Sequence, residues 1–259
     1  MQNNTFSGES RRQNLIVLDE LGSTNDYLKS ELANFKPLPE WSAIMARHQT
    51  AGRGQRDSTW TVEPNSNLTF SFVLYPDYLN LQDHFTLNML ISLGIHDWLI
   101  TKGITPEIKW PNDILINQKK VCGILIENKS AGKKIKQSVV GIGVNVNQKQ
   151  FFDGLENTAS SLFKETGIAT ENLEEECLNL LAFLQNRIEN FKNKKLTTND
   201  LLKTYNNFLF LRDKPARYAS SDITFQAILR KVDANGQLYL EQSDGIKTYF
   251  FKEVRFLMQ

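Results

Sequence analysis

Residues 107–128, with the sequence EIKWPNDILINQKKVCGILIEN, contain the pattern from which the fold is predicted most directly. Pro111 breaks the first apolar run, and two further apolar runs lie on either side of the polar residues Asn117 to Lys119. This arrangement is typical of two strands joined by a tight turn. Residues 136–147, KQSVVGIGVNVN, have the composition of a third strand. Because short connections join antiparallel neighbours, we expect an antiparallel meander.

The chain before the meander begins with a strand and a helix. Continuous aliphatic residues from Leu15 to Leu18 predict a strand in a buried sheet. Ser23 follows, and Asp26 completes a Ser-x-x-acid pattern that can satisfy the free amide groups at the start of a helix. We therefore expect a helix over residues 24–34.

Strands and helices continue on both sides of the meander. Residues 41–49 and 68–76 have strand composition, and a polar, glycine-rich loop separates them. The apolar residues of 85–100 cover most of a helix surface, which predicts a buried helix. Two more helices are predicted over residues 172–193 and 198–207, the first of them amphipathic.

The C-terminal segment has a different pattern. From Lys214 onward, short alternating runs are separated by the turn dipeptides Asn-Gly at 235–236 and Asp-Gly at 244–245. No helical periodicity remains there. We expect an α+β protein, with a mixed, largely antiparallel sheet flanked by helices over residues 1–211 and a small all-β barrel over residues 212–259.

Composition limits the classes of function. Of 259 residues, 41% are apolar and 23% charged, which is enough to bury a sizeable core. The 30 basic and 29 acidic residues give a net charge of +1, too small a field to hold DNA or an anionic membrane. Cys122 and Cys177 are too few for a disulfide framework and favour a reducing compartment. We expect a cytoplasmic protein with no membrane or DNA partner.

The run Gly52-Arg53-Gly54-Gln55-Arg56 is the first candidate site. Its glycines allow the backbone to approach a ligand closely, and its two guanidinium groups can bind phosphate or carboxylate oxygens. The alternative interpretation is a solvated, flexible loop. A P-loop is excluded because no Gly-Lys-Ser/Thr follows.

The segment KWPND at residues 109–113 is the second candidate. A turn fixed by proline would present the side chains of Asn112 and Asp113 together, and Asp113 could hold Mg²⁺ or a ribose hydroxyl. The alternative is a structural turn in which either side chain bonds its own backbone. Lys120 precedes an apolar strand and, taken alone, is best interpreted as a surface lysine.

Five motifs in order resemble those of the biotin protein ligases. They are Ser23-Thr24-Asn25, QTAGRG at residues 49–54 with Trp60, KWPND, KKVCGILIE and GIGVNVN. The resemblance extends over about residues 14–147, and more loosely through the C-terminal β segment. It implies the class II synthetase-like catalytic domain of biotin and lipoate ligases.

This resemblance implies a ligase with a two-step reaction. Biotin is activated by ATP, with Mg²⁺ present, to biotinyl-5′-AMP, and is then transferred to a lysine of a biotin carboxyl carrier protein or domain, such as that of acetyl-CoA carboxylase. About a dozen residues precede the first strand, too few for the winged-helix DNA-binding domain of regulatory members. We therefore expect a monofunctional enzyme that binds no DNA. An exposed edge of the meander could pair two subunits as a homodimer.

The resemblance also assigns residues to roles. Lys120 and Arg53 match catalytic positions, where cations offset charge on the α-phosphate. The positions that match biotin-binding residues are Ser23, Thr24, Asn25, Gln49, Gly52, Arg53, Gly54, Gln55, Lys120 and Gly123. The positions that match the nucleotide end of the site are Arg56, Trp60, Asn112 and Asn145, with Asp113 as the candidate Mg²⁺ ligand.

The sequence departs from the family pattern in the glycine-rich loop. Gln55 stands where many members carry Arg, and Asp57 and Ser58 stand where they carry a glycine and a basic residue. Either these changes weaken retention of the adenylate, or Asp57 points into solvent.

Three other functions compete with biotin ligation. A lipoate ligase or octanoyltransferase would need a longer apolar pocket, and Gln49 and KWPND favour biotin. A non-catalytic biotin or adenylate sensor is the second alternative, against which Lys120 and Arg53 argue. The third, a nucleic-acid-binding module, is disfavoured by the net charge of +1.

Overall fold

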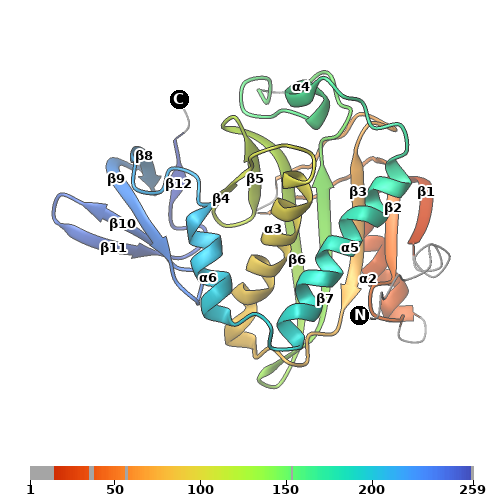
Figure 1. The fold of residues 1–259 in the computed structure, drawn as a ribbon, viewed down its shortest axis with the longest axis horizontal. Helices are drawn as coiled ribbons and strands as arrows, with labels where there is room; N and C mark the ends of the chain where they lie inside the picture. Colours follow the sequence, from red (N-terminus) through yellow and green to blue (C-terminus); the bar gives the residue numbers. More distant parts are fainter. Residues whose placement is uncertain (1–14, 35–37, 56–57, 153, 258–259) are drawn as a thin grey trace. The chain divides into compact units, whose positions relative to one another are not determined.

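The computed structural model describes residues 15–34, 38–55, 58–152 and 154–257 (Figure 1). Contacts between Cα atoms divide the chain into two compact units. The first unit comprises Met1–Leu79 and Val121–Ala182, and the second comprises Asn80–Lys120 and Phe183–Gln259.

The first unit is built on a mixed sheet. Within this unit the strands lie in the order β1-β2-β3-β7-β6, with β1 and β2 parallel and the other neighbours antiparallel. The helix α5, Leu173–Lys192, begins in this unit and ends in the second. The other elements are β1 (Leu15–Leu21), α2 (Thr24–Asn34), β2 (Ala43–Gln49), β3 (Leu68–Leu74), β6 (Lys119–Ala131), β7 (Lys134–Val144) and α4 (Leu162–Thr166). The part of β6 from Val121 onward belongs to this unit.

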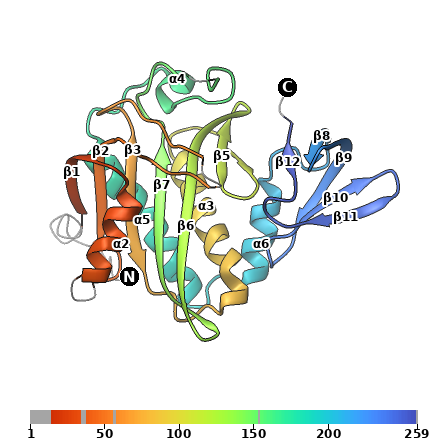
Figure 2. The same ribbon diagram turned by 180° about the vertical axis from the view of Figure 1, so that it is seen from behind.

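One face of this sheet is covered by α2, which packs on β2, β3 and β7 (Figure 2). Leu28 of the helix is fully buried in a cluster with Ile44, Val73 and Val139, one residue from each of these strands. Since burial of such side chains is worth about 1.5–3 kcal/mol each, this cluster fixes the helix on the sheet. The N-terminus of α2 is thereby held over β3 and β7.

The second unit contains helices and a separate sheet. The elements before this sheet are η1 (Leu81–Asp83), α3 (His84–Ile100), β4 (Glu107–Lys109), β5 (Asp113–Ile116) and α6 (Thr198–Asn207). The strands of the sheet are β8 (Pro215–Ser220), β9 (Ile223–Val232), β10 (Leu238–Gln242), β11 (Gly245–Tyr249) and β12 (Arg255–Phe256). Buried Asn206 joins α6 to β9, because its side chain both donates to and accepts from the backbone of Val232.

The prediction of a C-terminal barrel is wrong. The five strands form an open antiparallel sheet in the order β11-β10-β9-β8-β12, drawn in blue in Figure 1. Within the described residues β11 pairs only with β10, and the two-residue β12 pairs only with β8. A barrel would need these two edges to hydrogen-bond to each other. The predicted hairpin turns are confirmed, with Gly236 and Gly245 at φ angles of 83° and 121°.

The other predicted elements are found close to their expected bounds. α2 has the predicted range, and α3 begins one residue before the predicted helix. β6 and β7 pair antiparallel from Cys122–Val144 to Ala131–Lys134. The division at residues 211 and 212 stays a prediction. None of the helices in the described ranges has the length and apolar character needed to span a bilayer.

Candidate functional site

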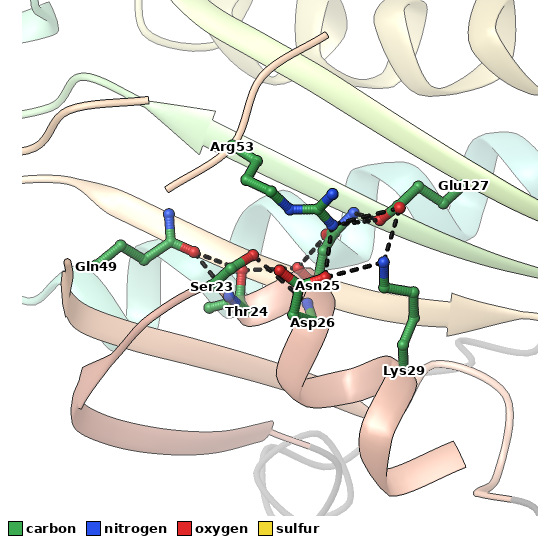
Figure 3. A network of polar contacts seen from close by, with 9 residues as sticks. Ser23, Thr24, Asn25, Asp26, Lys29, Gln49, Arg53 and Glu127 are labelled. Atoms are coloured by element: carbon green, nitrogen blue, oxygen red, sulfur yellow. Dashed lines mark hydrogen bonds and ion pairs between the residues drawn. The ribbon is translucent and has the colours of Figure 1, made fainter. Parts of the chain in front are cut away.

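The start of α2 meets the end of β2 (Figure 3). Thr24 donates hydrogen bonds from its backbone N–H and its hydroxyl group to Gln49 Oε1, over 2.8 and 3.0 Å. The parallel pairing of β1 and β2 sets Leu21 beside Gln49, so the chain that leaves β1 reaches this point within a few residues. Ser23, Thr24 and Asn25 are 8%, 4% and 3% exposed. Three polar side chains are therefore buried at one helix terminus.

These contacts fix the orientation of the Gln49 amide group. A backbone N–H can only donate, so the atom that faces Thr24 is the amide oxygen and the nitrogen points away. Within the described residues, Gln49 Nε2 donates to no protein group. Because Gln49 is only partly buried, this nitrogen is available to a ligand acceptor.

Asn25 is seated on a part of the sheet that carries no side chain. In the strand register Gly141 lies between Ser71 and Leu125, and a methyl group at Gly141 would lie 2.2 Å from Asn25 Oδ1. Ser71 Oγ lies 2.5 Å from Asn25 Oδ1 and 2.7 Å from Thr24 Oγ1. A single serine hydroxyl on β3 therefore links the two helix residues.

Glu127 on β6 accepts from three side chains, two on helix α2 and one in the glycine-rich loop (Figure 3). Asn25 Nδ2 donates to its carboxylate over 2.7 Å, Lys29 Nζ over 2.8 Å and Arg53 Nη2 over 3.2 Å. Arg53 Nη2 also lies 2.6 Å from Asp26 Oδ1, and Lys29 Nζ lies 2.9 Å from the same oxygen. Two cations and two carboxylates thus form one network.

The network shifts the pKa of Glu127. Partial burial by itself raises the pKa of this carboxyl group, but the hydrogen bonds from Lys29 and Asn25 and the charges of Lys29 and Arg53 outweigh it. The pKa of Glu127 is therefore lower than that of an ordinary glutamate. The carboxylate of Glu127 is therefore ionised in the folded protein at neutral pH.

We expect Glu127→Gln to lower the free energy of unfolding more at about pH 7 than at about pH 4. A carboxyl group with a lowered pKa stabilises the fold above its unfolded pKa, and this contribution is lost as the pH falls through the folded pKa. Urea unfolding of both proteins at the two pH values measures the difference. The exposed Glu171→Gln is the control. Equal destabilisation at both pH values would contradict the ion-pair account.

The glycine-rich loop folds back on itself. Trp60 N donates to Gly52 O over 2.9 Å, and Gly54 N donates to Ser58 O over 2.6 Å. A methyl group at Gly52 would lie 2.2 Å from Trp60 O, so no larger residue fits there. Gln55 is partly buried. The predicted site residue Arg56, like Asp57, lies outside the described residues.

The Trp60 indole packs on the same face of the sheet, at a second position where a glycine provides no side chain. A methyl group at Gly143 would lie 2.3 Å from Trp60 Cε2. Gly123 is paired directly with Gly143, so the neighbouring position on β6 carries no side chain either. The glycines of β6 and β7 thus make room for a flat ring.

Asn145 follows β7 and is buried. Its Nδ2 donates to Ser160 O over 3.0 Å, and its backbone N–H donates to Val121 O over 2.8 Å. Leu162 N donates to the Asn145 carbonyl group over 3.0 Å. These contacts tie the chain after β7 to β6 and to the start of α4.

In the second unit, Lys120 and Asp113 form an ion pair. Lys120 Nζ lies 2.7 Å from Asp113 Oδ1, and both side chains are partly buried. The pKa of nearby Lys109 is lowered, first by burial and then by the charge of Lys120, although Asp113 opposes the shift. Within the described ranges, no group of three or more His, Cys, Asp or Glu residues could hold a metal ion.

The KWPND segment is fixed by α3, by α6 and by the sheet of the second unit. Asn88 of α3 and Tyr205 of α6 both donate to Pro111 O, over 2.5 and 2.9 Å. Trp110 Nε1 donates to Gly236 O in the turn between β9 and β10, over 3.0 Å. Asn112 is 8% exposed. The turn before Asp113 is therefore held rigidly.

The structure brings the predicted site residues together in two groups. Thr24, Asn25, Gln49 and Arg53 share one polar network in the first unit, and Asp113 contacts Lys120 in the second. Sequence reasoning missed the other members of the first network, which are Asp26, Lys29, Ser71 and Glu127. It also missed the roles of Gly141 and Gly143, against which Asn25 and Trp60 pack. Two signals were available, because Thr69 and Ser71 alternate with phenylalanines in β3 and Glu127 shares the strand face of Gly123.

Comparisons with known proteins agree with one another. The model of the biotin/lipoate A/B protein ligase family matches residues 17–145. The bifunctional ligase/repressor BirA of Bacillus subtilis is 32% identical over 247 residues, which cover 93% of this chain and 74% of the relative. The biotin--[acetyl-CoA-carboxylase] ligase of Paracoccus denitrificans is 38% identical over 164 residues, 61% of this chain and 67% of the relative.

A solved structure has the same fold over nearly the whole chain. The biotin protein ligase from Aquifex aeolicus, in complex with biotin and ATP, superposes with a TM-score of 0.78 and 26% sequence identity. The match covers 95% of this chain and 100% of that protein.

Proposed function

Because this chain belongs to the biotin/lipoate A/B protein ligase family, we propose that it is a biotin protein ligase. In the first step a carboxylate oxygen of biotin attacks the α-phosphorus of ATP, and pyrophosphate leaves. In the second step a lysine amine of the carrier attacks the acyl carbon of biotinyl-5′-AMP, and AMP leaves. The carrier is a biotin carboxyl carrier protein or domain.

The observation that carries the choice of biotin is the buried polar group at the start of α2. Ser23, Thr24 and Asn25 are nearly inaccessible, yet Gln49 Nε2 is left as a donor beside them. A ureido ring is flat and carries both donors and acceptors. It offers an acceptor to Gln49 Nε2, whereas an aliphatic acyl chain would leave this donor unpaired, at a cost of about 1–3 kcal/mol.

The catalytic contribution of the chain is electrostatic. Negative charge is redistributed over the α-phosphate during the attack, and preorganised cations stabilise it. Lys120 and Arg53 are the proposed cations. Each has a carboxylate partner that orients it, Asp113 for Lys120 and Glu127 for Arg53. Mg²⁺ would be held by the phosphates of ATP and by Asp113, since a single carboxylate is a usual protein contribution to such an ion.

Other residues are proposed for the nucleotide. Trp60, which packs against Gly143, provides a flat apolar surface. Asn112 and Asn145 are proposed to contribute amide groups to nucleotide binding. Arg56 is the further proposed cation. The reaction is proposed to take place in the cytoplasm, where ATP is available. The homodimer stays a prediction.

We expect Gln55→Arg to lengthen the lifetime of the enzyme-bound adenylate. A guanidinium group in the loop would add one cation near the phosphate and strengthen its retention. The measurement is the rate at which labelled biotinyl-5′-AMP leaves the enzyme when no carrier is present. Gln55→Lys, which adds the charge without the planar fork, is the comparison. An unchanged rate in both variants would show that the departure at residue 55 has no effect on retention.

The proposed function is tested by weighing a carrier domain after incubation with the protein, ATP, Mg²⁺ and biotin. The carrier is expected to gain the mass of one biotinyl group at its acceptor lysine. Parallel incubations contain lipoate or octanoate. An unmodified carrier with biotin and a modified one with lipoate or octanoate would support the lipoate ligase alternative, and no modification by any acid would support the sensor.

A further inference from the structure

We propose that Glu127 is a positioning residue of the biotin-activating site, which sets the loop cation Arg53 and the helix residue Asn25 in one shared arrangement. This inference rests on the proposed function and deepens it. Glu127 lies on β6, Asn25 on α2 and Arg53 in the glycine-rich loop, so the carboxylate joins three separate segments of the first unit (Figure 3).

The two oxygens of Glu127 divide the contacts. Oε2 accepts from Asn25 Nδ2 over 2.7 Å, and Oε1 accepts from Lys29 Nζ over 2.8 Å. Arg53 Nη2 lies 3.2 and 3.3 Å from the two oxygens. The Glu127 side chain is only 29% exposed, so water competes poorly for these contacts. Charge-assisted hydrogen bonds of this kind are the stronger ones in proteins.

The contact with Asn25 extends to the proposed headgroup residues. Asn25 Nδ2 donates to Glu127 while its Oδ1 accepts from Ser71, so both ends of the amide group are fixed. The Ser71 hydroxyl in turn contacts the Thr24 hydroxyl, and the backbone N–H of Thr24 donates to Gln49. A continuous chain of hydrogen bonds thus runs from the carboxylate to the amide group that offers a donor to the ligand.

The contact with Arg53 leaves part of its guanidinium group unused. Within the described residues, every hydrogen bond of this group, to Asp26 and to Glu127, is made by Nη2. A guanidinium group has five N–H donors, so Nε and Nη1 remain for a carboxylate or phosphate of the ligand. The charges of Arg53, Lys29, Asp26 and Glu127 sum to zero. The two carboxylates fix the orientation of the Arg53 guanidinium group, so its Nε and Nη1 donors are held in place for the ligand.

Asp26 provides a matched comparison. Its carboxylate contacts the same Nη2 atom and the same lysine, but it is 51% exposed, and within the described residues it accepts no hydrogen bond from the Asn25 side chain. Asp26→Asn removes one partner of Arg53 and leaves the link to Asn25 in place. Glu127→Gln removes a more buried ionic partner of Arg53 and also changes the acceptor of Asn25.

The test is a double-mutant cycle on the full chain with Glu127→Gln, Arg53→Ala and the double variant. Pyrophosphate release is measured while biotin and ATP are varied separately, and biotin binding without ATP is measured by calorimetry. Glu127→Gln is expected to lower kcat about tenfold through Arg53, and to raise the KM and Kd for biotin about tenfold through Asn25. Asp26→Asn is expected to lower kcat less and to leave the Kd for biotin unchanged.

The double variant separates positioning from independent action. Its kcat is expected to be no lower than that of Arg53→Ala, because Glu127 affects kcat only through Arg53. Its Kd for biotin is expected to stay raised. Multiplied losses of kcat, or wild-type kcat and Kd in Glu127→Gln, would overturn the proposal. A purely structural role would lower the urea midpoint and leave both constants unchanged, which also overturns it.

The wild-type protein reports on the proposed function separately. If it released pyrophosphate with lipoate or octanoate and not with biotin, the proposed function would fail, and the same cycle would be measured with that acid. If no acid were activated, the role of Glu127 would be tested by the Kd for biotin alone, which is expected to rise in Glu127→Gln. A wild-type protein that binds no biotin would overturn both proposals.

Discussion

Lys120→Ala is expected to slow the formation of biotinyl-5′-AMP by about 10²-fold or more. The lysine is proposed to bring its ammonium group to the reacting carboxylate and phosphate, and Asp113, at 2.7 Å, holds that group in place. A charge that acts mainly on the transition state affects kcat more than KM. Single-turnover measurement of pyrophosphate release gives the rate directly.

The adjacent lysine provides the control for this prediction. Lys119 lies next to Lys120 on β6, but alternation along a strand points its side chain to the opposite face. Lys119→Ala is expected to keep the wild-type rate. Urea unfolding of both variants separates loss of chemistry from loss of fold. Near-normal pyrophosphate release by folded Lys120→Ala would refute the role of this lysine.

Gly141→Ala is expected to weaken biotin binding by about tenfold or more and to destabilise the fold by about 1–3 kcal/mol. Its methyl group would lie 2.2 Å from Asn25 Oδ1 and 3.0 Å from Asn25 Cγ, so the amide group must leave its place. Asn25 would then lose its contacts with Ser71 and Glu127, both made in largely buried surroundings. Titration calorimetry with biotin and urea unfolding measure the two effects.

Gly22→Ala is the matched substitution, because a methyl group there would approach only Ala51 Cβ, at 4.0 Å. Gly22 is exposed and lies in the same unit. It is expected to cost little in stability and to leave the Kd for biotin near the wild-type value. If both glycine variants weakened biotin binding equally, the effect could not be assigned to Asn25.

The local elements could be predicted from the sequence because their signals are local. The capping pattern of Ser23 and Asp26 gives the start of α2, and Asp26 N does donate to Ser23 Oγ. The polar pair Asn117-Gln118 marks the turn before β6, where both residues have positive φ angles, 49° and 66°. Such patterns depend only on neighbours in the chain.

The barrel and the polar network depend on contacts between distant residues. Closure of the C-terminal sheet would require a longer last strand than Arg255–Phe256, and alternation of polar and apolar residues does not fix strand length. Ser71 and Gly141 meet through the register of β3 and β7. A register is set by the whole sheet, so neither residue can be assigned to Asn25 from its own segment.

The order of the motifs predicted Thr24, Asn25 and Gln49 as site residues, but it assigned no role to Glu127. Thr24 and Gln49 are 25 positions apart, and Asn25 and Glu127 are 102 positions apart, yet each pair is in hydrogen-bond contact. Sequence spacing alone indicates neither contact. The resemblance located the motifs, and the register of the strands explains why their polar side chains come into contact.

The most direct test of biotin activation is exchange of labelled pyrophosphate into ATP, without any carrier protein. Adenylate formation is reversible, so an enzyme that forms biotinyl-5′-AMP returns the label to ATP only when biotin is present. We expect exchange with biotin, its loss in Lys120→Ala, and none with lipoate or octanoate. Exchange that requires lipoate or octanoate instead of biotin, or no exchange with any of the three acids, would contradict the account.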